Sequence, residues 1–238
     1  MHPSAVAILA NLQVVEAERK RRSADPVLGA KVVALKAFQQ RRFTHTYADL
    51  LASARYGAAA RFFLEELYGP GDFTRRDAQF ARVVPGMTRF FPNEIVATVA
   101  TLGELHALSE TFDTTLGALL ADARITAADY VRVWQQAGRP SDRERQIALT
   151  LSVATDLDRL TRKPFLRQSL RLMRGPARAA GLTELQRFLE SGFDTFQAMN
   201  GAKEFIDLVG KRERALAAAL FAAGSNGTSM QQALTSLP

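Results

Sequence analysis

The chain has 238 residues, of which 47% are apolar and 23% charged, with a formal net charge of +7 and no cysteine. A chain of this length and composition can bury a core unaided, and the lack of cysteine excludes disulfides, thiolate nucleophiles and cysteine-ligated metal centres. No segment has the roughly 18 consecutive apolar residues of a membrane-spanning helix, and residues 1–15 do not resemble a signal peptide, so we expect a cytoplasmic protein without membrane contact.

Helical periodicity runs along almost the whole chain. Apolar residues recur three and four positions apart, and no sustained alternation typical of a strand is found. The predicted helices span 3–22, 27–43, 47–68, 75–91, 93–122, 127–137, 141–162, 164–180, 184–199 and 202–223. We therefore predict an all-α fold, a single-domain bundle of about eight to ten helices. Residues 1–224 form this domain, and the polar residues 225–238 are assigned to a flexible C-terminal tail.

Four helix starts are predicted from a threonine followed three positions later by an acid or glutamine, which together cap exposed backbone N–H groups. The pairs are Thr46 with Asp49, Thr74 with Asp77, Thr126 with Asp129, and Thr183 with Gln186. Pro85 predicts a kink or break within 75–91 because it lacks a backbone donor. The longest helix, 93–122, would extend about 45 Å, and we expect it at the centre of the bundle.

The segment 61–77 predicts a helical corner rich in aromatic residues. It contains a helix that ends at Gly69, a turn, and a new helix from Thr74. We expect an ion pair between Arg61 and Glu65, one turn apart. A rigid corner is the simpler interpretation, and a binding pocket is the alternative. The candidate residues for a pocket or a buried ion pair are Arg61, Tyr68, Asp72, Arg76 and Asp77, joined by Arg212 and Glu213 from the last helix.

Arg212 and Glu213 are included because they interrupt an apolar stripe. A charge on such a stripe needs a partner, such as an Asp or Arg from the corner or a group of a ligand. A structural ion pair is the favoured interpretation.

The run FFLEELYGPGDFTRRD, from Phe62 to Asp77, resembles a signature, FFLxxLYGxxDFxxRD, of uncharacterised all-helical proteins of proteobacteria. The stop at Phe90 to Pro92, the triplet Arg212 to Arg214 and the ending Leu220 to Gly224 are similar to later parts of such proteins. The resemblance covers most of the chain. It implies an all-helical fold and carries no activity, cofactor or catalytic residue.

His106 and Glu110 lie one turn apart in the long helix, with Asp113 one turn further. This spacing is compatible with an imidazole oriented for proton transfer, although a structural role is the simpler interpretation. The three histidines and the lack of a Glu-x-x-His pattern argue against a metal centre. Known motifs for dinucleotide, phosphate-loop, zinc-protease or serine-hydrolase chemistry are also missing, so we expect no cofactor and no metal.

A basic segment lies between positions 139 and 178, with ten Lys/Arg against four acids. Within it, Arg167, Arg171, Arg174 and Arg178 are spaced four, three and four apart. On one helix opened by Pro164 they would form a stripe able to bind an anion. A break of this helix at Gly175 and Pro176 is the alternative, and it would detach Arg178 from the stripe. A solvated surface paired with acids is the simpler interpretation.

Three functional hypotheses follow. The leading one is a non-catalytic helical protein that binds either a small ligand between helices or an anionic partner, such as an acidic protein or a nucleic-acid backbone, on the face of Arg167 to Arg178. The second is an enzyme with a polar site at the corner of Arg61 to Asp77, using Tyr68 or His106 to move a proton. The third is a homo-oligomer, such as a homodimer, whose amphipathic first helix packs against a partner chain.

Overall fold

The protein is described here from a computed structural model, which covers residues 3–67, 73–163, 165–222, 231, 233–235 and 237–238. The elements are α1 (Pro3–Ala24), α2 (Pro26–Thr46), α3 (Ala48–Ala52), α4 (Gly57–Phe62), a π-helical turn η1 (Phe63–Leu67), α5 (Thr74–Phe90), α6 (Asn93–Leu119), α7 (Ala127–Ala137), α8 (Pro140–Thr161), α9 (Leu166–Leu172), α10 (Arg174–Ala179), α11 (Thr183–Ala198) and α12 (Lys203–Ala222). These residues contain helices and no strand, so the predicted all-α, single-domain fold is confirmed.

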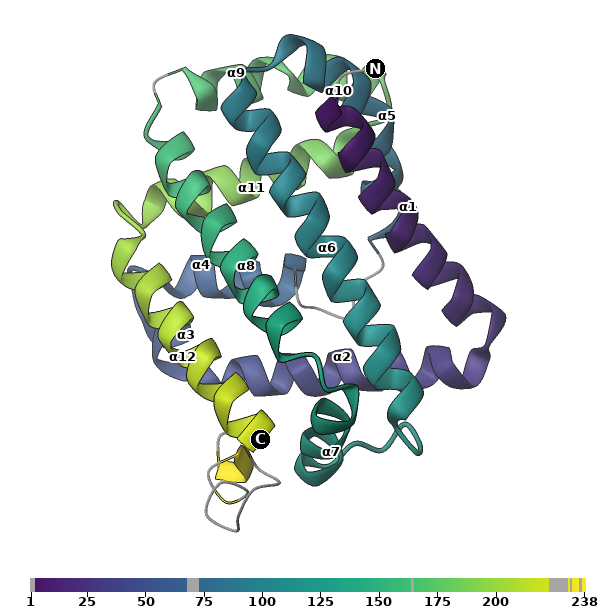
Figure 1. Cartoon of the computed structure of the whole chain (residues 1–238). Coiled ribbons are helices and arrows are strands. Elements are labelled where there is room, and N and C mark those ends of the chain that lie inside the picture. The colour runs from purple at the N-terminus through teal and green to yellow at the C-terminus, as the bar shows by residue number, and fades with distance from the viewer. Residues whose placement is uncertain (1–2, 68–72, 164, 223–230, 232, 236) are drawn as a thin grey trace.

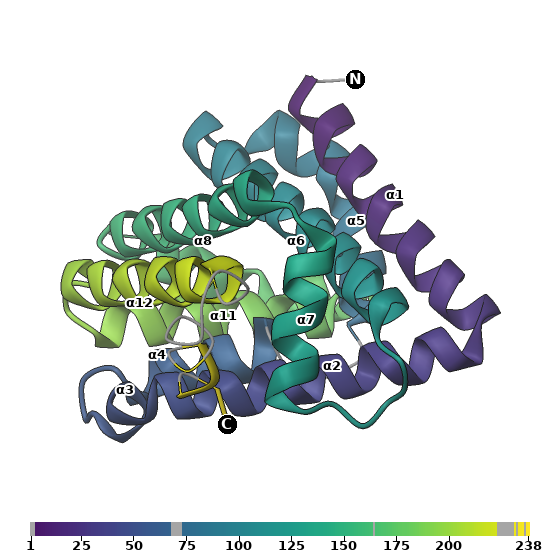
Figure 2. The ribbon, with the colours of Figure 1, turned by 60° about the horizontal axis from the view of Figure 1, so that its bottom comes forward.

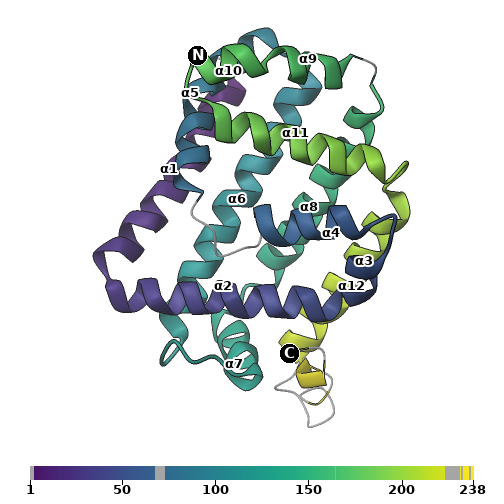
Figure 3. The same ribbon diagram turned by 180° about the vertical axis from the view of Figure 1, so that it is seen from behind.

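The helices form two layers that cross steeply around α6. Figures 1 and 3 show α1, α6 and α8 in one layer, with α2, α4 and α11 running across them in the other. Helix α6 packs against α1, α2, α5, α7 and α8, which confirms that the longest helix is central. Figure 2 shows α12 beside α8, with α7 closing the end of the bundle near α2.

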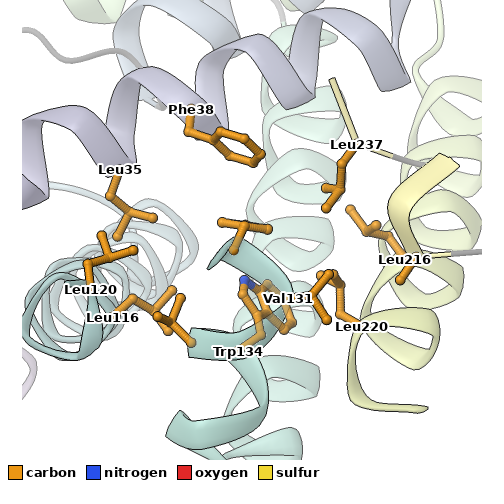
Figure 4. Packing of buried hydrophobic residues seen from close by; sticks show 12 residues of the cluster. Leu35, Phe38, Leu116, Leu120, Val131, Trp134, Leu216, Leu220 and Leu237 are labelled. Atoms are coloured by element: carbon orange, nitrogen blue, oxygen red, sulfur yellow. The ribbon is translucent and has the colours of Figure 1, made fainter. Parts of the chain in front are cut away.

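Hydrophobic packing joins α2, α6, α7 and α12 at one end of the bundle. Figure 4 shows Leu35 and Phe38 from α2, Leu116 and Trp134 from α6 and α7, and Leu220 from α12 facing one another. A second cluster lies around Phe43, Tyr47, Phe196 and Phe205, and a third joins Ile8 to Val84.

The apolar face of the first helix, α1, packs against other helices of the same chain. Ala5, Ile8 and Val15 of α1 are buried, and α1 packs against α5 and α6. That face is therefore occupied, although Val6 and Val14 on α1 remain exposed.

The predicted capping boxes were right in only one case of four. Thr126 and Asp129 cap α7 reciprocally. Thr46 instead ends α2, and Thr74 and Thr183 are the first residues of α5 and α11, which have no side-chain cap. The acids or amides of these three pairs bind elsewhere in the fold: Asp49 to Arg212, Asp77 to Arg19 and His106, and Gln186 to Leu170 and Glu190.

Two predicted helices are divided. The segment 47–68 breaks at Ser53, whose extended backbone ends α3 and whose hydroxyl accepts the backbone N–H groups of Arg55 and Tyr56 before α4. The segment 164–180 breaks at Met173 between α9 and α10. Pro176 has no N–H to donate to the carbonyl four residues earlier, which favours a break at this place. Pro85, in contrast, lies inside the continuous helix α5, so of the predicted kink or break, the break does not occur.

Part of the predicted C-terminal tail is packed. Residues 223–230, 232 and 236 lie outside the described residues. Ala233 and Leu237 are buried in the cluster with Leu216 and Leu220, so the prediction of a flexible tail was wrong for these two residues.

No helix among the described residues combines the length and the hydrophobicity that crossing a membrane requires.

Candidate functional site

A cavity of about 200 Å³ lies inside the bundle, and α2, α5, α6, α8, α11 and α12 supply most of its lining residues. Most of its surface is apolar, including Phe80, Leu102, Phe188 and Val209. Charged side chains also reach it from α2, α5, α6, α8 and α12. Charged groups are rarely buried without partners, so their contacts determine what the cavity can bind.

The first charged group joins α1, α5 and α6 around Asp77. One carboxylate oxygen of Asp77 accepts from Arg19 at 2.6 Å and lies 2.9 Å from Nε2 of His106, while the other accepts from Arg76 at 3.2 Å. Burial raises the pKa of Asp77, but the hydrogen bond and charge of His106, the charge of Arg76 and the hydrogen bond of Arg19 outweigh burial and hold this pKa well below its usual range. Asp77 therefore stays ionised and fixes the position of the His106 ring.

The second group is centred on Glu110 of α6. Its carboxylate binds Arg22 of α1 and, at 2.8 Å, Lys36 of α2. Burial raises the pKa of Glu110, but these two cations, Lys36 above all, lower it to about 2. Asp113, one turn along α6, accepts from Gln39 at 3.2 Å and lies 3.5 Å from Lys36. Burial and the nearby charge of Glu110 raise the pKa of Asp113 against the effect of Lys36.

The third group joins α2 to α12. Nη1 of Arg42 lies 2.5 Å from the carboxylate of Glu213, which also accepts from the hydroxyl of Tyr47 at 2.6 Å. The side chains of Arg42 and Glu213 are only 6% and 20% exposed. The predicted structural ion pair of the last helix therefore exists, but its partner comes from α2 and not from the predicted corner.

Arg143 of α8 completes the polar lining. Its guanidinium lies over the rings of Phe112, at 3.6 Å, and Trp134, at 4.2 Å, and donates to Gln146 at 2.8 Å. Aromatic faces attract cations and fix the plane of a guanidinium. Gln146 in turn donates to Ser109 of α6 at 2.8 Å, so the position of Arg143 is set by both α6 and α8.

Only some of the residues predicted for the corner line the cavity. Arg76, Asp77 and Glu213 line the cavity together with His106 and Glu110. Arg61 is exposed and donates to the carbonyl of Leu51 at 3.2 Å, in place of the predicted ion pair with Glu65. Arg212 binds Asp49 at the surface through two bonds of 2.7 Å. Tyr68 and Asp72 lie outside the described residues.

The predicted arginine stripe is divided between α9 and α10 and is partly neutralised. Arg167 binds Asp194 at 2.5 Å, and Arg174 binds Glu190 at 2.5 Å. The side chains of Arg171 and Arg178 are exposed. The expectation of one helix presenting four aligned guanidinium groups was therefore wrong, because the chain turns at Met173 and α11 supplies two acids.

The cations that line the cavity from α2 and α8 were not predicted from the sequence. Lys36, Gln39 and Arg42 repeat every three residues along α2, beside the buried Leu35 and Phe38. Polar residues at this spacing inside an apolar stripe could have been recognised as a buried polar face. Arg143 carries no comparable signal, because it follows Asp142 in a run of surface charges.

Comparison with known proteins gives a family without an activity. A family model described as a domain of unknown function (DUF8198) matches residues 18–227. This supports the resemblance to an uncharacterised family, while the signature and the proteobacterial range stay predictions. No curated protein and no solved structure matches the chain significantly.

Replacing Glu110 by Gln tests the buried network. The variant keeps the shape of the side chain but leaves Arg22 and Lys36 without its charge, so we expect the free energy of unfolding at pH 7 to fall by about 3–5 kcal/mol. The pKa of Glu110 rises from about 2 to its ordinary 4.5 on unfolding. Its contribution is therefore present above pH 4.5 and is lost as the pH falls toward 2.

Urea unfolding of wild type and E110Q between pH 7 and pH 3 measures both effects, and the difference between the two proteins should shrink below pH 4.5. Glu144→Gln is the matched control, since Glu144 pairs with Arg214 at the surface and should cost less than about 1 kcal/mol. Equal losses in the two variants would contradict a buried role for Glu110.

Proposed function

Because the chain belongs to this family, whose domain has no assigned function, we propose a function from the geometry alone: the protein binds a small molecule inside the bundle. The observation that carries the proposal is the cavity of about 200 Å³, which has both an apolar and a charged lining. Protein interiors are normally packed without such voids, and ligand sites typically combine apolar walls with a few polar groups.

The apolar lining suits the body of a ligand. Phe73, just before α5, and Phe80 of α5 line one part of the cavity. Phe188 of α11 and Ile206 and Val209 of α12 also line it. Burial of apolar ligand surface against these side chains favours binding by about 25 cal/mol per Å². The charged groups provide orientation, because their positions are fixed by ion pairs between helices.

Three other expectations from the sequence remain predictions: an anionic partner, a homo-oligomer and a cytoplasmic location. An acidic protein or nucleic-acid backbone at the face of Arg167 to Arg178 is less favoured, since Glu190 and Asp194 occupy two of its arginines. The homo-oligomer hypothesis loses its specific support, because the buried apolar face of α1 packs within the chain. Cytoplasmic location is also a prediction.

Filling the cavity tests ligand binding. Ile147 of α8 lines it, and Ile147→Trp should occupy space that a ligand needs. Leu172→Trp adds the same bulk at an exposed position on α9, where Leu172 is 77% exposed. Native mass spectrometry of the purified proteins should detect a non-covalently bound molecule in wild type and L172W, and little or none in I147W.

Bare chain masses for wild type and both variants, with no bound molecule in any of the three, contradict the proposal. Circular dichroism verifies that I147W is folded. If it is not, Val209→Phe, also in the lining, replaces it.

Proton transfer by His106 is a second candidate function, favoured by the contact between His106 and Asp77 at the cavity surface. An ionised Asp77 accepts a hydrogen bond from Nε2–H of His106, which leaves the lone pair of the neutral ring on Nδ1. A ligand proton could then move to Nδ1, and Asp77 would stabilise the imidazolium. This hypothesis keeps the enzyme alternative but replaces the corner by a dyad between α5 and α6.

Nitrogen-15 NMR tests this dyad, because the chain contains only His2, His45 and His106. We expect His106 to be protonated on Nε2 and unprotonated on Nδ1 when it is neutral. Asp77→Asn should reduce this preference, whereas His45→Gln should leave the His106 signals unchanged and assist assignment. A neutral His106 that carries its proton on Nδ1 contradicts the dyad.

A further inference from the structure

Building on the proposed ligand-binding function, we infer that the ligand carries an anionic group, a carboxylate or a phosphate, which binds at Arg42 and Arg143. Three independent features of the cavity support this assignment: a buried donor, an oriented guanidinium, and an excess of positive charge.

The buried donor belongs to Arg42. This residue is 5% exposed and lines the cavity. Its Nη1 binds Glu213, but its Nε is buried and has no hydrogen-bond acceptor among the residues that the structure describes. A buried N–H without an acceptor costs free energy, and the cost is larger when the group is charged. An oxygen atom of a bound anion would satisfy it.

The oriented guanidinium belongs to Arg143, which is 7% exposed. Its plane is held by the rings of Phe112 and Trp134, and Gln146 accepts from one of its terminal nitrogens. A guanidinium binds carboxylate or phosphate oxygens through N–H groups along its edge. The contacts with both rings and with Gln146 fix the direction in which this edge points.

Arg42 of α2 and Arg143 of α8 both line the cavity, and the Trp134 ring over which Arg143 lies is 5.9 Å from the ring of Tyr130. Burial raises the pKa of the Tyr130 hydroxyl, and the charges of Arg42 and Arg143 both oppose that rise. Tyr130 itself lines the cavity. One anionic group near this hydroxyl would therefore meet donors from two helices at once.

Charge within the interior also favours an anion. Among the described residues, the cavity's charged side chains and the arginines paired with them comprise six cations and four carboxylates. The cations are Arg19, Arg22, Lys36, Arg42, Arg76 and Arg143, and the carboxylates are Asp77, Glu110, Asp113 and Glu213. The excess is two positive charges with His106 neutral. Uncompensated charge is costly away from water, so an anion complements this interior and a cation does not.

Matched pairs of small aromatic probes test the inference. Isothermal titration calorimetry of the full-length protein compares benzoate with benzamide, and phenyl phosphate with phenol. We expect each anion to bind at least about tenfold more tightly than its neutral partner. The stronger of the two anions then distinguishes a carboxylate site from a phosphate site.

Two variants should change this preference in opposite directions. Arg143→Met removes one cation and should reduce the preference for the anion to about twofold or less. Asp113→Asn removes a carboxylate near Arg143 and should increase anion affinity several-fold. Arg214→Gln, at the surface of α12, should change neither the preference for the anion nor the affinity for it. D113N keeps the test decisive even if R143M fails to fold.

Equal affinity for anionic and neutral probes, or the absence of saturable binding by both anions, would overturn the assignment. These outcomes differ from failure of the proposed function. A neutral molecule found by native mass spectrometry in wild type and lost in I147W would keep ligand binding and remove only the anionic class.

Discussion

The ion pairs of Glu110 set the main constraint on this bundle. This carboxylate is buried on the central helix α6 and binds Arg22 of α1 and Lys36 of α2. A buried carboxylate is tolerated only when it is paired, so α1 and α2 must both lie beside this turn of α6. Asp77 of α5 imposes a similar requirement one turn earlier on α6, where it joins Arg19 of α1 to His106.

Polar groups at these positions also explain why the centre of the bundle is not filled with hydrocarbon. Arg42 and Glu213 join α2 to α12, while Arg143 lies between aromatic rings beside α6. The side chains hold one another at the cavity surface instead of interdigitating across it. Apolar packing continues beside this zone, in the cluster that contains Leu35, Leu116 and Leu220. The same charges that position the helices thus leave a space with fixed polar groups.

Local signals in the sequence predicted the helices well, and tertiary contacts decided the rest. Thr126 and Asp129 form their predicted cap because both partners lie in one turn. Asp49 does not cap a helix because Arg212, distant in sequence, binds it instead. His106 and Glu110 were recognisable from their spacing on α6, yet their partners Asp77 and Lys36 come from other helices. Periodicity shows that a polar residue is buried, but it does not identify which helix will neutralise it.

Anomalous diffraction from crystals soaked in sodium bromide tests the central claim, that the interior carries an excess of positive charge available to an anion. Bromide replaces the anionic group of a ligand without requiring its identity. The account predicts a bromide peak within hydrogen-bonding distance of Arg42 and Arg143. Bromide at exposed arginines such as Arg171 and Arg178, with none inside the cavity, would contradict it.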